Sequence, residues 1–203
     1  FLSRAKGNTI LLPKMWPVGD IDDDDSILES SYTDDLREQV SAIDPLRRIL
    51  LLSEIIWRAA SYEITRAQAI LVARELASFV DQLQIEGIEV ESFDDLVPEE
   101  YSEHWQKALH LLKAIQGPWK TILDSEGVVD PMDRRNRILR LRADQWRKAL
   151  PKYPIIAAGS TGSIPATREL FSCVAELPLG AVILPGLDQS LDEDSWARIG
   201  PMH

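Results

Sequence analysis

Apolar side chains recur at helical spacing through the middle of the chain, from about residue 44 to residue 150. Gaps of three and four residues between apolar positions are typical of helices that pack one face against a core. Asp44 and Pro45 favour the start of one helix, Thr65 and Gln68 match a capping box for the next, and Gly87 favours its end. Further helices are predicted over residues 98–117, 119–123 and 130–150.

The pattern changes after residue 151, where two short apolar runs, 154–158 and 181–184, are bounded by turn residues. Such runs are typical of strands that are buried on both faces. Between them, Ser163 can cap and Pro165 can open a helix. One face of that helix carries Leu170, Phe171, Val174 and Leu177. The order predicts one βαβ unit of a parallel sheet, with the loop after the first strand at the sheet edge where ligands bind.

A third apolar run, Thr9–Leu12, precedes the helical region and ends at Pro13, so it is also predicted to be a strand. A short strand, a long series of helices and a βαβ unit do not form a simple doubly wound domain. We therefore expect an α/β fold with a parallel sheet, built from residues 1–33 and 151–203, and a mostly α-helical insertion over residues 34–150.

The charge and composition of the chain argue against some classes of function. The net charge of −11 argues against non-specific coating of nucleic acid, and no apolar run is long enough to predict a membrane span. The single cysteine, Cys173, lies on the apolar face of its helix and is expected in a core. Nine acids between Asp20 and Glu38 predict a solvated loop, with cation binding as the alternative. Because Phe1 is not an initiator methionine, we expect a fragment of a longer cytoplasmic protein.

The loop after the first strand of the βαβ unit consists of Gly159, Ser160, Thr161, Gly162 and Ser163. It does not match a P-loop, because Ile164, Pro165 and Ala166 stand where glycine, lysine and a hydroxyl residue are needed. The dinucleotide fingerprint G-x-G-x-x-G fails as well, since Thr161 stands where its second glycine is needed. A looser form, G-x-x-G-x-x-G, matches Gly159 and Gly162 but has Pro165 in place of its third glycine. The string is similar to the start of the NADPH loop of deoxyxylulose-phosphate reductoisomerases, so a cofactor module is one alternative. A tight turn with glycines at positive φ is the other.

Basic residues gather near the end of the helical region, at Arg134, Arg135, Arg137, Arg140, Arg142, Arg147 and Lys148. Such a strip can follow a nucleic-acid backbone. The alternative is a solvated helix face that pairs with local acids such as Asp133 and Asp144. Aromatic residues in the same region can stack on bases, although their helical spacing with Leu and Ile favours core positions; they are Trp57, Tyr62, Trp105, Trp119 and Trp146.

Three segments, 11–20, 154–167 and 180–188, together with Trp196, carry a resemblance to a known family. The first reads LLPKMWPVGD, the second PIIAAGSTGSIPAT and the third GAVILPGLD. With these strings the chain resembles the amino-terminal part of the AddB subunit of AddAB-type helicase–nucleases of the alphaproteobacterial kind. The matches lie near both ends, and the helical middle agrees only in order and length.

The resemblance implies a superfamily-1, P-loop NTPase-like helicase domain interrupted by a helical subdomain. It implies DNA binding, an AddA-like partner subunit and a role in double-strand-break repair by homologous recombination. The resemblance implies that Ala158 and Gly159 stand where active relatives carry the Asp-Glu pair that holds Mg²⁺. It also implies that Asp188 is a remnant of the γ-phosphate sensor, whose glutamine is missing here. The expected function is therefore a non-catalytic scaffold that guides DNA ends, with no cofactor of its own. The alternatives are an NADPH-binding module and an acidic α-helical interaction domain.

Overall fold

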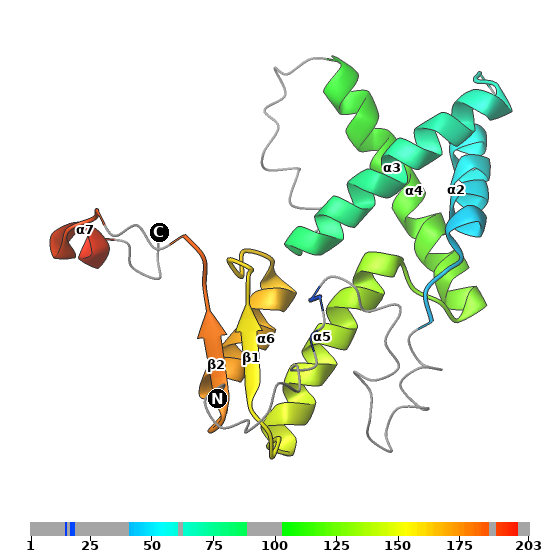
Figure 1. Cartoon of the computed structure of the whole chain (residues 1–203). Helices are drawn as coiled ribbons and strands as arrows, with labels where there is room; N and C mark the ends of the chain where they lie inside the picture. The colour runs from blue at the N-terminus through cyan, green and yellow to red at the C-terminus, as the bar shows by residue number, and fades with distance from the viewer. Residues whose placement is uncertain are drawn as a thin grey trace, which may run out of the picture.

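The computed structural model describes residues 15, 17–18, 41–60, 63–88, 103–186 and 190–198, without the side chains of 103–111 and 196–197. These residues form six helices and two strands (Figure 1). In chain order they are α2 (Pro45–Ala59), α3 (Arg66–Glu86), α4 (Glu103–Glu126), α5 (Pro131–Lys148), β1 (Ile155–Ala158), α6 (Pro165–Glu176), β2 (Gly180–Ile183) and α7 (Glu193–Arg198). The predicted strand Thr9–Leu12 and the acidic stretch Asp20–Glu38 lie outside the described residues. No helix of the described residues is long and apolar enough to cross a membrane.

The predicted boundaries of α2 and α3 are confirmed by their caps. The Asp44 carboxylate accepts a hydrogen bond from the amide of Arg47 at 2.9 Å. Thr65 and Gln68 form the reciprocal capping box, which satisfies two amides that the first turn leaves without partners. Gly87 ends α3 with a φ of 68°, a left-handed conformation that glycine adopts without steric cost.

The predicted break at Gly117 and Pro118 is wrong, because α4 continues through both residues. A proline inside a helix removes one backbone hydrogen bond and crowds the preceding turn. The cost is offset by packing on either side: Ile115 is 3% exposed and Trp119 is 6% exposed. Tertiary burial therefore outweighs the local signal that favours a break.

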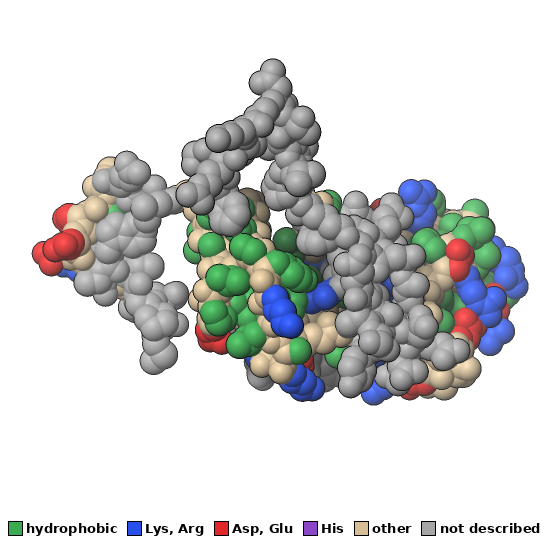
Figure 2. Space-filling view, turned by 60° about the horizontal axis from the view of Figure 1, so that its bottom comes forward, with side chains coloured by type: hydrophobic (Ala, Val, Ile, Leu, Met, Phe, Trp, Pro, Cys, Tyr) green, Lys and Arg blue, Asp and Glu red, His purple; other side chains and the backbone are tan. Residues whose placement is uncertain are grey.

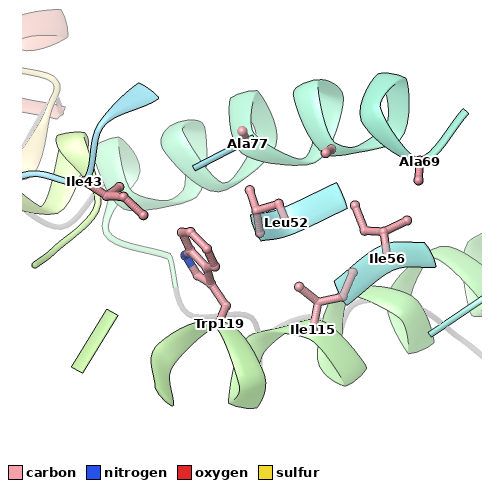
Figure 3. Packing of buried hydrophobic residues seen from close by; sticks show 8 residues of the cluster. Ile43, Leu52, Ile56, Ala69, Ala77, Ile115 and Trp119 are labelled. Atoms are coloured by element: carbon pink, nitrogen blue, oxygen red, sulfur yellow. The ribbon is translucent and has the colours of Figure 1, made fainter. Parts of the chain in front are cut away.

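The first core lies between α2, α3 and α4 (Figure 3). α2 contributes Leu52 and Ile56, and α4 contributes Ile115 and Trp119. The facing surface of α3 is a row of small residues, Ala69, Ala73 and Ala77, so the helices approach each other closely. Other apolar residues of the same helices lie on the surface: Leu46 is 68% exposed, Leu50 is 51% exposed and Ile70 is 37% exposed.

The second core lies between α5 and α6. Leu139 and Ala143 of α5 pack against Ala166, Leu170 and Cys173 of α6. The Cys173 thiol donates a hydrogen bond to the carbonyl of Ala143 at 3.3 Å, and its burial confirms the expected core position. Val18 and Trp146 pack on the margin of this cluster.

The βαβ unit is present, but the fold class predicted around it is wrong. β1 and β2 pair in parallel, with Ile155 beside Gly180 and Ala158 beside Ile183. Within the described residues the sheet has only these two strands and helices make up most of the structure, which is not a parallel-sheet helicase-like domain. An apolar run of four or five residues fits a strand at any depth, so the sequence pattern overstated the sheet.

Within the described residues, helix α6 covers one face of the sheet and no element covers the other. The side chains of Ile155 and Val182 are half-buried on the face that α6 packs against, whereas Ile156 is 63% exposed and Ile183 is 59% exposed on the other face. Figure 2 shows hydrophobic side chains gathered over the two strands, next to Lys and Arg side chains. Parallel sheets are normally covered on both faces, so the expectation of strands buried on both faces is also wrong.

Candidate functional site

The loop that follows β1 is largely closed on itself. Gly159 and Gly162 have φ angles of 83° and 68°, which agrees with the predicted tight turn. The Gly162 amide donates to the Ser160 hydroxyl at 3.2 Å, and the Thr161 and Ser163 hydroxyls are 3.3 Å apart. The loop therefore uses much of its own hydrogen-bonding capacity internally.

The start of α6 differs from the prediction. Ile164, and not Ser163, occupies the N-cap position, and no side chain caps the helix. The carbonyl of Ser163 instead accepts a hydrogen bond from the Arg168 guanidinium at 3.3 Å. Pro165 lies in the first turn, as predicted, where its missing N–H has no cost.

The positions that the family resemblance assigns to lost motor chemistry are only partly described. Ala158 and Gly159 lie at the exposed end of β1, and neither has a side chain that can ligate a metal. Asp188 lies outside the described residues. No group of three or more His, Cys, Asp or Glu residues that could hold a metal ion occurs in the described part of the chain.

The basic strip is on α5, and several of its arginines are paired with acids. Arg137 contacts Asp133 at 2.8 Å, one helical turn away. Arg147 contacts Asp144 at 3.3 Å, and Glu169 of α6 at 3.6 Å. The predicted pairing with local acids is thus confirmed for these two arginines. Arg140 also contacts Glu169, at 3.4 Å.

Two arginines of the strip have a different environment. Arg135 and Arg142 are half-buried, and the part of the chain that the structure describes gives neither a carboxylate partner. Burial lowers the pKa of the Arg135 guanidinium. Burial also lowers the pKa of Arg142, against a smaller opposing effect of Tyr153. The guanidinium carbon of Arg142 lies 5.6 Å from the ring centroid of Trp146, a cation–π arrangement that orients the side chain.

The tryptophans with described side chains serve mainly to pack the cores. Trp119 is buried, and Trp57 donates its ring N–H to the carbonyl of Ile64 at 3.0 Å. The Arg66 guanidinium stacks 3.9 Å above the Trp57 ring. These contacts favour the predicted core role over stacking on bases. Tyr62 and the side chain of Trp105 lie outside the described residues.

A buried polar cluster joins the two cores, and the sequence pattern gave no sign of it. Arg48 of α2 is 5% exposed and its Nε lies 2.7 Å from the Asp130 carboxylate, which is itself 2% exposed. The Trp119 ring and the Gln84 amide also donate to Asp130, at 2.9 and 3.1 Å. Asp81 contacts Arg48 from the other side at 2.9 Å. Asp130 occupies the N-cap position of α5, yet its side chain makes no cap hydrogen bond, because it is directed to this cluster.

Comparisons with protein-family models, with curated proteins and with solved structures give no match to this chain. Function must therefore be argued from the residues and their geometry.

Proposed function

We propose that this chain is a non-catalytic scaffold within a cytoplasmic helicase–nuclease of DNA double-strand-break repair. In this role it holds an AddA-like partner subunit and guides DNA ends toward homologous recombination. The sequence resemblance at residues 11–20, 154–167 and 180–188 supports the assignment to this machinery. The proposal assigns no catalytic residue to the chain and does not include the helicase-like fold.

The observation that carries the proposal is the charge of α5. Residues 131–148 hold seven basic side chains against two acidic ones, a local net charge of +5 on a chain of net charge −11. Arginine is well suited to phosphate, since its planar guanidinium binds two oxygens at once. A cationic helix on an acidic protein confines a DNA backbone to one surface and disfavours contact elsewhere.

The sheet face that none of the described helices covers supports the scaffolding part of the proposal. Ile156, Ile183 and Leu184 are each more than half exposed on and beside the two strands. Contiguous exposed apolar side chains on a protein surface mark sites where another protein binds. The same surface also favours the second candidate function, an acidic α-helical interaction domain without DNA, because such a domain needs only a partner surface.

DNA binding separates the two candidates. We would titrate a fluorescently labelled duplex with a single-stranded tail and follow anisotropy between 50 and 200 mM salt. Saturable binding that weakens linearly in a plot of log K against log salt is expected for phosphate contacts. Replacing all seven basic residues of α5 by Gln should abolish it, and helix content should persist because Gln and Arg have similar helix propensity.

A control variant removes two exposed arginines from α2 and α3, the helices of the first core. Arg58 and Arg66 are exposed and both pair with Glu54 at 2.9 Å, so their replacement by Gln removes surface charge without touching α5. This variant should bind DNA as the wild type does. A wild-type chain that fails to bind tailed duplex even at 50 mM salt would refute the DNA-guiding role and leave the interaction domain.

A further inference from the structure

The seven basic residues of α5 are not equivalent, and the difference lies in which face of the helix they occupy. Arg135 and Arg142 are seven residues apart, so they share one face and are separated by about 10 Å along the helix axis. Arg140 and Arg147 share a different face, where both contact Glu169 of α6. Two rows of arginine therefore run along α5, one neutralised by acids and one not.

Arg135 and Arg142, which form the row without acidic partners among the described residues, are cations that are partly buried. The Nη1 of Arg135 and the Nη2 of Arg142 are buried, and the described part of the chain offers neither atom a hydrogen-bond partner. The rest of each side chain is still partly open to solvent. A half-buried cation without a counter-charge is unfavourable, so an anion that reaches it gains more than an anion at an exposed site. By contrast, an anion at Arg137 or Arg147 must first displace a carboxylate.

We infer that Arg135 and Arg142 form a phosphate-binding pair that takes two phosphodiester groups of one nucleic-acid strand. Their backbone positions lie about 10 Å apart along the helix axis, so each arginine would contact a different phosphate of the strand. Trp146 holds the Arg142 guanidinium in place from one side, which reduces the entropy that binding must remove. The inference rests on the proposed function and names the residues through which α5 would contact DNA.

The test compares two double variants that remove the same charge from the same helix. Arg135→Gln with Arg142→Gln removes the proposed pair, and Arg137→Gln with Arg140→Gln removes two arginines that already have acid partners. Binding of a labelled single-stranded oligothymidylate is measured by anisotropy across a salt series. Loss of two phosphate contacts should reduce the salt slope by about 1.4 and the affinity at low salt by roughly tenfold or more. The control pair should change both much less.

A second variant guards against loss of structure. Arg135→Lys with Arg142→Lys keeps the charge but not the planar fork, so the salt slope should remain near that of the wild type while affinity falls. Circular dichroism must show the same helix content in all variants. Equal losses in the Arg135/Arg142 and Arg137/Arg140 variants would contradict the inference, because they would indicate a diffuse cationic surface.

The other outcomes separate failure of the inference from failure of the proposed function. If the wild type binds the oligonucleotide and the Arg135/Arg142 variant binds it equally well, DNA guidance stands and the pair is wrong. If the wild type binds inorganic phosphate through Arg135 and Arg142 but binds no oligonucleotide, the pair is a small-anion site, and both statements about DNA are wrong. Tighter binding of polyglutamate than of the oligonucleotide would identify an acidic protein as the ligand and overturn the inference.

Discussion

Removing the Asp130 carboxylate should destabilise the fold far more than removing an exposed charge. Asp130 is 2% exposed, pairs with Arg48 at 2.7 Å, and accepts hydrogen bonds from Trp119 and Gln84. Breaking a buried ion pair from one side costs about 3–5 kcal/mol when the remaining charge is left without a partner, and because Arg48 keeps Asp81 at 2.9 Å the loss of this pair alone should lie at the lower end of that range. Asp130→Ala should lie near 5 kcal/mol, since it also leaves two donors unsatisfied.

Asp130→Asn is the better variant for measurement. Asparagine keeps one acceptor for the Trp119 ring and removes the charge, so its cost should lie nearer 3 kcal/mol. A small domain is stable by about 5–15 kcal/mol, so this variant should still fold. Urea unfolding is followed by circular dichroism. If the m-value is unchanged, the shift of the midpoint gives the loss in free energy of unfolding.

Asp133→Asn provides the matched control three residues further along the same helix. Asp133 pairs with Arg137 near the surface, and its side chain is 34% exposed, so its loss should cost no more than about 1 kcal/mol. A cycle with Arg48→Met completes the experiment. Because Arg48→Met removes the cation that has lost its contact with Asp130, the double variant should be more stable than the sum of the single losses implies. Additive losses, or an Asp130→Asn cost as small as that of the control, would refute the reasoning.

Three further predictions follow from the packing and the pKa shifts. Gly180→Ala should lower the free energy of unfolding by more than about 3 kcal/mol, because the new Cβ would overlap the carbonyl of Val174. A hydrogen bond from Arg47 lowers the pKa of Glu126, so the Arg47–Glu126 pair stabilises the fold above the ordinary glutamate pKa. This stabilisation is lost as pH falls through the lowered pKa. Carboxyl NMR titration should show the lowered pKa of Glu126, and an unshifted pKa would contradict the pair. Burial raises the pKa of the Cys173 thiol, so a thiol reagent should react slowly with the native chain and rapidly in urea, while equal rates would contradict its core position.

Local signals in the sequence predicted what depends on neighbouring residues. Asp44, the Thr65–Gln68 box and Gly87 set the limits of α2 and α3 through hydrogen bonds and backbone angles within a few positions. The βαβ unit and the buried face of α6 followed from apolar spacing in the same way. Such features need no knowledge of the rest of the chain.

Features that depend on distant partners were missed. Arg48 stands among apolar residues of α2, but it is buried because Asp130, far away in the sequence, faces it. Asp130 directly precedes Pro131, as a helix cap would, and only the tertiary structure shows that its carboxylate pairs with Arg48 and does not cap α5. Likewise, the composition of α5 predicted a basic strip, but the division between acid-paired and unpaired arginines depends on Glu169 of the neighbouring helix.

Contacts with α2, α3 and α6 fix the position of α5, and a fixed position matters for the proposed binding surface. Leu139 and Ala143 pack against α6, Asn136 donates to the Gln84 carbonyl of α3 at 2.7 Å, and Asp130 pairs with α2. A helix fixed by two cores keeps its outward side chains at constant spacing, which a binding surface for a regular polymer requires. The polar cluster around Asp130 thus contributes to the proposed DNA contact without touching DNA. Its loss should lower the stability of the chain, but it should leave the salt slope of DNA binding unchanged wherever the protein remains folded.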